Sequence, residues 1–214
     1  MNDRTQMTLD RLIGQLDQAL HTVFGPTPIP GRENPARQKT EVALSGAERD
    51  LAGRLMRINH VGEICAQALY QGQAVTARRP DVREKMQQAS REENDHLAWT
   101  EERLRELGSH ASYLNPLWYS VSYAFGALAG IIGDKWSLGF IAETEKQVVE
   151  HLTDHLHRIP AVDTKSRAIL EQMRIDEGQH ATVAIESGGA GMPEPVKQLM
   201  RGASKIMTRT AYWI

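Results

Sequence analysis

The chain has 214 residues, of which 41% are hydrophobic and 24% charged, and its formal net charge is −2. This composition is typical of a globular protein with a sizeable core, and it excludes collagen-like, disordered and disulfide-rich classes. Because acids and bases nearly balance and no basic tract stands out, we expect no nucleic-acid partner.

The first predicted element is a helix over residues 8–24, where apolar residues recur with a helical period. These residues are Leu9, Leu12, Ile13, Leu16, Leu20, Val23 and Phe24. The proline-rich stretch GPTPIPGRENP follows and predicts a loop. We therefore predict that residues 1–44 form a helical extension and linker, and that residues 45–214 form the main domain.

Four long helices are predicted after the linker, because each stretch has a helical period and ends near glycine or proline. They cover about residues 45–79, 80–107, 116–158 and 164–187. Ser45 and Glu48 have the spacing of a capping box at the start of the first. The third contains several glycines between residues 126 and 133, where it can be interrupted.

A last helix is predicted after Pro193 and Pro195, with apolar residues on one side. No useful length of the sequence alternates with a period of two, which is the pattern of a strand. The predicted fold class is therefore all-α, with four long central helices and one amphipathic helix flanking them at each end.

The most apolar stretch, LWYSVSYAFGALAGIIG over residues 117–133, carries no charge. It is shorter than the ~20 apolar residues that cross a bilayer, and it contains tyrosines and serines. We interpret it as a buried or interfacial helix, whose apolar face is covered either by protein or by lipid.

Two of the central helices each carry a Glu-x-x-His motif, Glu93 to His96 and Glu177 to His180. Residues three apart share one helix face, so each pair can direct a carboxylate oxygen and an imidazole nitrogen at one point. One such motif alone is typical of a solvated face. Two copies indicate a dinuclear iron or manganese centre, provided that each remaining helix adds a glutamate.

Glu63 is the candidate from the first helix, because it lies at about the same height as Glu93 relative to the intervening turn. The third helix offers Glu143, Glu145 and Glu150. Glu145 has apolar neighbours one and two turns away on its face, whereas the other two share a polar face. A carboxylate among apolar residues is costly without a partner, and a dication is the natural partner.

The predicted ligand set therefore combines four carboxylates with two neutral imidazoles. Its members are Glu63, Glu93, His96, Glu145, Glu177 and His180. This donor set suits two divalent ions of borderline hardness, usually iron, whereas zinc prefers sulfur or more nitrogen. The single cysteine, Cys65, is expected to be a small core residue.

An acid immediately precedes each motif, Glu92 in one and Asp176 in the other. Metal-bound histidines commonly donate their second N–H to a carboxylate. Asp176 is therefore expected to hold His96, and Glu92 to hold His180, across the site; the alternative is that both acids face solvent.

His60 lies one turn before Glu63, whereas His151 lies six residues after Glu145 and points partly away from it, and both are candidates only for positions beside the ligands. Asn94 and Asp95 are expected to face outward, as members of the polar side of their helix.

The motif Asn59-His60-Val61-Gly62-Glu63, followed by Glu93-x-x-His96, Glu145 and Glu177-x-x-His180, resembles the demethoxyubiquinone hydroxylase family of ubiquinone biosynthesis. The resemblance covers about residues 45–214. It implies a ferritin-like di-iron monooxygenase that hydroxylates the ring of a polyprenylated demethoxy-quinol with O2. By position, the ligands of that family fall on the same six residues.

The resemblance also implies electrons that come ultimately from NADH. Since the sequence has no Gly-x-Gly-x-x-Gly motif, a bound nicotinamide, a partner reductase and the quinol itself all remain candidate routes. It further implies a membrane surface as partner, which residues 118–132 and the last helix with Trp213 would contact. The alternative is that these apolar segments pack into the core or into an oligomer interface.

One cysteine and no recognisable secretory signal favour a cytoplasmic protein, here bound peripherally to the cytoplasmic face of the cell membrane. Three alternative functions are compatible with the same predicted ferritin-like fold: a peroxide-scavenging enzyme, a tRNA-modifying enzyme and an iron-storage protein. A fourth is a membrane-associated helical adaptor without metal.

Overall fold

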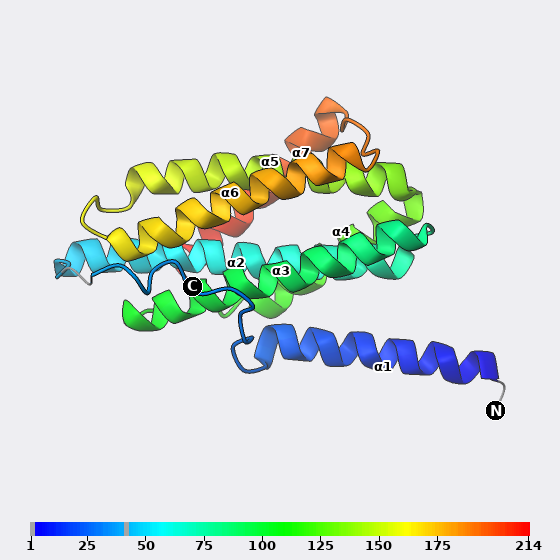
Figure 1. Cartoon of the computed structure of the whole chain (residues 1–214), viewed down its shortest axis with the longest axis horizontal. Coiled ribbons are helices and arrows are strands. Elements are labelled where there is room, and N and C mark those ends of the chain that lie inside the picture. The colour runs from blue at the N-terminus through cyan, green and yellow to red at the C-terminus, as the bar shows by residue number, and fades with distance from the viewer. Residues whose placement is uncertain (1–2, 41–42) are drawn as a thin grey trace.

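The computed structural model describes residues 3–40 and 43–214, with side chains from residue 13 onward, and this part of the chain contains seven helices and no strand (Figure 1). The helices are α1 (Asp3–Phe24), α2 (Gly46–Thr76), α3 (Pro80–Glu106), α4 (Asn115–Ile132), α5 (Asp134–Arg158), α6 (Thr164–Glu186) and α7 (Glu194–Ala211). The predicted all-α class is confirmed. Leu9 and Leu12, which we assigned to the apolar side of the first helix, lie outside the described side chains.

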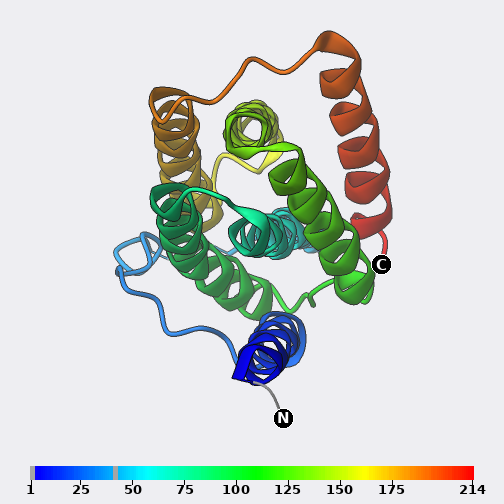
Figure 2. The same cartoon turned by 90° about the vertical axis from the view of Figure 1, so that its right-hand side faces the viewer.

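Four helices form the central bundle: α2 packs against α3, α5 packs against α6, and the two pairs meet along α3 and α6 and along α2 and α5 (Figure 2). Its apolar core has two layers. One is built around Leu55, Trp99 and Leu152, and the other around Tyr70 and Ile141. On each of the four helices, the predicted metal ligands lie in sequence between these layers, so apolar residues enclose the polar site on both sides.

The helix starts follow local chemistry that the sequence displays. The Ser45 hydroxyl accepts a hydrogen bond from the backbone N–H of Glu48, whose carboxylate accepts one from the backbone N–H of Ser45, as a capping box requires. Asp163 caps α6 by accepting from the backbone N–H of Ser166.

The predicted third helix over residues 116–158 is two helices, α4 and α5, and is interrupted within the glycine-containing stretch 126–133 where the sequence allowed a break. The break falls at Gly133, whose φ of 142° is rarely open to other residues. The carboxylate of Asp134 then accepts hydrogen bonds from the backbone N–H groups of Arg78 and Arg79, which fixes the start of α5 against the α2–α3 turn. Only α5 joins the bundle, while α4 packs along α2.

The N-terminal segment lies against the bundle. Helix α1 contacts α2 and α4, and residues 25–40, called the strap below, run from the end of α1 past α3 toward the start of α2 (Figure 1). Asn34 and Ala36 of the strap are buried. The division of the chain at residue 44 stays a prediction. Among the described residues, no helix combines the length and the apolar character needed to cross a membrane.

Candidate metal centre

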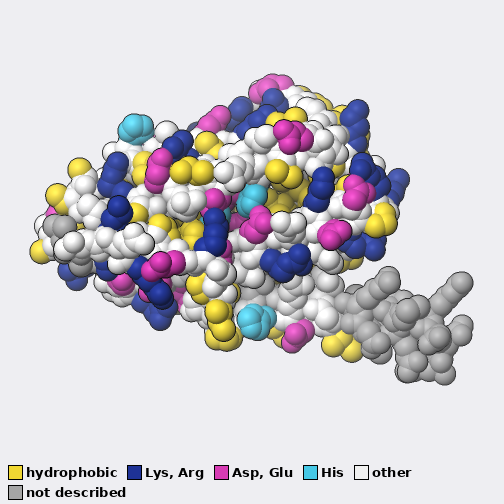
Figure 3. All heavy atoms as spheres, viewed as in Figure 1, with side chains coloured by type: hydrophobic (Ala, Val, Ile, Leu, Met, Phe, Trp, Pro, Cys, Tyr) yellow, Lys and Arg dark blue, Asp and Glu magenta, His cyan; other side chains and the backbone are white. Residues whose placement is uncertain are grey.

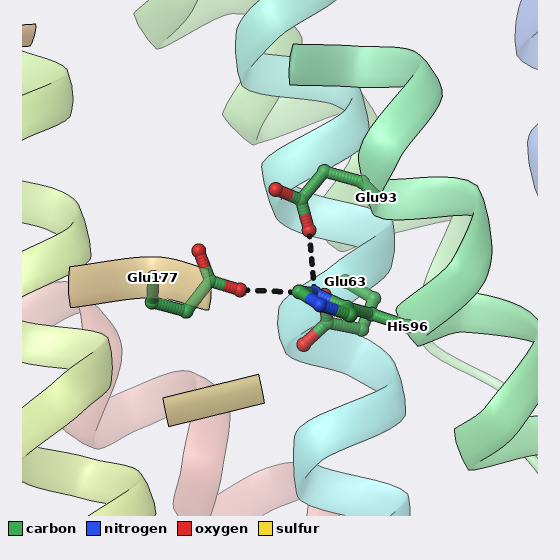
Figure 4. Close-up of side chains that lie close together, drawn as sticks. All are labelled: Glu63, Glu93, His96 and Glu177. Carbon is green, nitrogen blue, oxygen red and sulfur yellow. Dashed lines mark hydrogen bonds and ion pairs between the residues drawn. The ribbon is translucent and has the colours of Figure 1, made fainter. Parts of the chain in front are cut away.

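Four of the six predicted ligands converge in the middle of the bundle. Glu63, Glu93, His96 and Glu177 are all buried, and each offers one ligand atom within 4.8 Å of those of the others. Figure 4 shows these carboxylates, from α2, α3 and α6, directed toward the ring of His96. The sequence alone therefore predicted a set of side chains that the fold brings together from three separate helices.

The two motif histidines are linked by two shared carboxylates. Nδ1 of His96 lies 3.2 Å from Oε2 of Glu93 and 3.1 Å from Oε1 of Glu177. Nδ1 of His180 lies 3.3 Å from Oε1 of Glu93 and 3.1 Å from Oε2 of Glu177. Each carboxylate thus offers one oxygen to each histidine, so Glu93 and Glu177 would serve two neighbouring cation positions, one beside His96 and one beside His180.

The other two glutamates complete these positions. Oε2 of Glu63 lies 3.5 Å from Nδ1 of His96, so Glu63 would contribute to the cation position beside His96. Glu145 is buried, and the charges of Glu177, Glu93 and His180 all act on its carboxylate, so it lies near enough to the cluster to sense their charge.

The chemistry of the cluster fits cations. Burial raises the pKa of Glu63 and Glu145 well above the usual range of a carboxyl group. Burial opposes the charge on His180, yet the acceptor carboxylates of Glu177 and Glu93 beside its ring raise its pKa to about 12. Among the described residues, buried Oε2 of Glu63 and Oε1 of Glu93 accept no hydrogen bond, although a histidine nitrogen lies within 3.5 Å of each. Two dications in place of these protons would balance four carboxylates and leave both imidazoles neutral.

The acids that precede the motifs occupy the outer side of the histidines. Nε2 of His96 lies 2.9 Å from Oδ2 of Asp176, and Nε2 of His180 lies 3.0 Å from Oε2 of Glu92. Both contacts cross between α3 and α6, as the sequence analysis expected. With an N–H on Nε2 directed at these acids, Nδ1 of each ring would be the nitrogen that binds a metal ion in the cluster.

His60 and His151 take other places. His60 is buried, lines a small crevice between α1, α2 and α3, and has a pKa lowered by burial to about 4. His151 packs against His155, with ring centroids 3.9 Å apart, and burial likewise lowers its pKa to about 4. None of their contacts in the described part of the chain reaches the cluster, so neither is assigned a role there.

Three residues of the site were missed or misplaced from sequence. The hydroxyl of Tyr70 donates a 2.6 Å hydrogen bond to Oε1 of Glu145. The sequence could have indicated Tyr70, because it lies two helical turns after Glu63 and therefore on the same face of α2. Asp95 was expected to face outward, which is wrong, because it is buried and accepts a hydrogen bond from the side chain of Arg32. No sequence pattern pointed to Arg32, since it lies in the proline-rich linker.

Comparison with known proteins agrees with this geometry. The family described as "Ubiquinone biosynthesis protein COQ7" matches residues 50–211. A protein of Nitrosococcus oceani is 58% identical over 214 residues, with both chains covered in full. A protein of Stutzerimonas stutzeri is 58% identical over 205 residues, or 96% of this chain and 95% of the relative. One of Nitrosomonas eutropha is 55% identical over 212 residues, or 97% and 100% of the two chains. All three are named 3-demethoxyubiquinol 3-hydroxylase.

Proposed function

The chain belongs to the family of the ubiquinone biosynthesis protein COQ7, and we propose that it is a 3-demethoxyubiquinol 3-hydroxylase with a di-iron centre. The observation that carries the iron assignment is the pair of shared carboxylates, Glu93 and Glu177, each with one oxygen toward His96 and one toward His180. The substrate is a demethoxy-quinol with a polyprenyl tail, and O2 is the second substrate.

In the proposed reaction one atom of O2 enters the quinol ring and the other leaves as water, which requires two electrons and two protons. Two iron ions, when bound, supply the redox chemistry by which O2 is activated. Six side chains would hold the ions, and the two apolar layers of the core would limit the access of water to them. NADH is the proposed ultimate source of the electrons.

Tyr70 and Asp176 have positioning roles in this proposal. The Tyr70 hydroxyl holds the carboxylate of Glu145, which would otherwise be free to rotate among apolar neighbours. Asp176 accepts from Nε2 of His96 and so keeps Nδ1 available as a metal ligand.

Deletion of the gene tests the proposed activity against its rivals. We expect the deletion strain to accumulate demethoxy-quinone and to lack ubiquinone, and a copy of the wild-type gene to restore ubiquinone. The matched control is a copy that encodes Glu145→Ala, which should be produced but should not restore it. Normal ubiquinone levels in the deletion strain would contradict the proposal and favour peroxide scavenging, tRNA modification, iron storage or an adaptor.

We also propose that α4 and α7 attach the enzyme to the membrane in which a polyprenylated substrate dissolves. Exposed apolar residues of these helices and of the chain end are Leu117, Phe125, Leu128, Ile131, Ile132, Leu199, Ile206 and Trp213. The two helices lie on the same side of the bundle (Figure 2), and Trp118 of α4 and Met207 of α7 pack against the same apolar cluster, which includes Ile58 and Val61 of α2. Such a surface is of the kind that inserts into the interfacial region of a bilayer. The proposed location is the cytoplasmic face of the cell membrane.

Flotation with phospholipid vesicles tests this attachment. The wild-type protein should float with the vesicles, whereas Leu128→Ser with Ile131→Ser should remain at the bottom of the gradient. A control pair on an exposed part of α6, Val183→Ser with Ile185→Ser, should float like the wild type. If the α4 variant also floats, the proposed surface is wrong.

A further inference from the structure

The strap is fastened to the outside of the metal centre by one arginine. Nε of Arg32 donates to Oδ2 of Asp95 at 2.7 Å, and its Nη2 lies 2.9 Å from Oδ2 of Asp176. Asp95 lies on α3 and Asp176 on α6, so this single cation joins the two helices that carry the Glu-x-x-His motifs. The guanidinium also lies over the ring of Trp99, 5.0 Å from its centroid.

The strap around Arg32 is built to hold it there. The backbone N–H of Gly31 donates to Oδ1 of Asp95 at 2.6 Å, and the side chain of Asn34 donates to Glu102 at 2.7 Å. Figure 3 shows charged side chains of both signs gathered on this face of the molecule. A segment that the sequence marks only as a linker therefore has specific anchors on both sides of the arginine.

Arg32 acts on a metal ligand through one intermediate. Oδ2 of Asp176 lies within 2.9 Å of both Nη2 of Arg32 and Nε2 of His96, while its Oδ1 accepts from Gln172. The carboxylate is thus held from two sides and aimed at the imidazole. Partners of this kind orient a metal-bound histidine and tune its basicity, with typical effects of about 10–100-fold on metal affinity.

The other half of the site lacks an equivalent cation among the described contacts. Glu92, which faces Nε2 of His180, accepts from the neutral amide of Gln88, and its side chain is 44% exposed. The Asp176 side chain is only 10% exposed. The two proposed cation positions therefore share Glu93 and Glu177 but differ in the carboxylate that contacts Nε2 of the histidine. Asp176 beside His96 is paired with an arginine, whereas Glu92 beside His180 accepts from a neutral amide.

We propose that Arg32 is a positioning residue of the metal centre, which fixes His96 through Asp176 and makes the His96 position the tighter of the two cation positions. This inference rests on the proposed function, because it requires that the cluster bind two ions. The strap then contributes to metal binding in addition to connecting α1 to the bundle.

The test is titration of the metal-free full chain with Co²⁺, followed by the absorption of the bound ion, which needs no enzymatic turnover. The wild type should bind two ions, one more tightly than the other. Arg32→Gln should weaken the tighter step by about 10–100-fold and leave the weaker step within about twofold. Arg32→Lys, which keeps the charge but not the paired geometry, should fall between them.

Two further variants separate positioning from general loss of structure. Arg174→Gln removes an exposed arginine that pairs with Glu171 on α6, and it should leave both steps unchanged. In an Asp176→Asn background, Arg32→Gln should add no further loss, because the path to His96 is already broken. Overlapping titrations of Arg32→Gln and wild type, equal weakening of both steps, or full additivity with Asp176→Asn would overturn the inference. A wild type that binds no ion would instead overturn the proposed function, and the inference with it.

Discussion

Glu177→Ala is expected to lose both iron ions and to lower hydroxylation by roughly three orders of magnitude or more, because no other group provides the metal chemistry. One oxygen of Glu177 lies 3.1 Å from Nδ1 of His96 and the other lies 3.1 Å from Nδ1 of His180. Its removal therefore takes one ligand from each cation position at once. Glu145→Ala should likewise lose iron together with activity.

Iron per chain and the hydroxylated quinol formed per minute are the two quantities to measure, on the same preparation. Glu171→Ala is the matched control, since Glu171 lies on α6 and, in the described part of the chain, its ion pair is with the exposed Arg174. It should keep two irons per chain and full activity. Substantial hydroxylation by an iron-depleted Glu177→Ala protein would show that the cluster is not the reaction centre.

The clustering of these side chains could be predicted from the sequence because the same Glu-x-x-His spacing occurs on two helices. Spacing of three residues puts a glutamate and a histidine on one helix face, and two such helices need only pack side by side to bring four groups together. Glu145 was chosen from three candidates because its neighbours are apolar, and the structure places it in the core. The expected partners of His96 and His180 followed from the acids next to each motif.

The strap was not predictable by the same means. Arg32 reaches Asp95 and Asp176 across 63 residues and more of sequence, and its position depends on the path of an irregular segment. No period or motif describes such a path. Asp95 was placed on the outer, polar side of its helix, which is correct for the helix alone; the strap then covers that side, and the residue becomes buried.

The α4–α5 break shows a second limit of sequence analysis. Glycines between residues 126 and 133 marked a weak point, but they serve two different purposes. Gly133 provides the backbone conformation at the break. Gly126 instead allows close approach: a Cβ there would lie 2.2 Å from the backbone oxygen of Leu69 on α2. On the opposite helix, a Cβ on Gly72 would lie 2.3 Å from the backbone oxygen of Tyr123.

Gly126→Ala is therefore expected to destabilise the protein although alanine is the better helix former. The added methyl group meets backbone, which cannot rotate away, so α4 must shift from α2 at a cost of about 2 kcal/mol or more in the free energy of unfolding. For a chain of this size the cost corresponds to a fall in melting temperature of about 4–8 °C. The control is Gly202→Ala on α7, where a Cβ would meet no heavy atom within 4 Å. It should raise stability by up to about 1 kcal/mol, as helix propensity alone predicts. Thermal unfolding followed by circular dichroism compares the two, and equal stabilisation by both would mean that α4 does not pack on α2 through backbone contact.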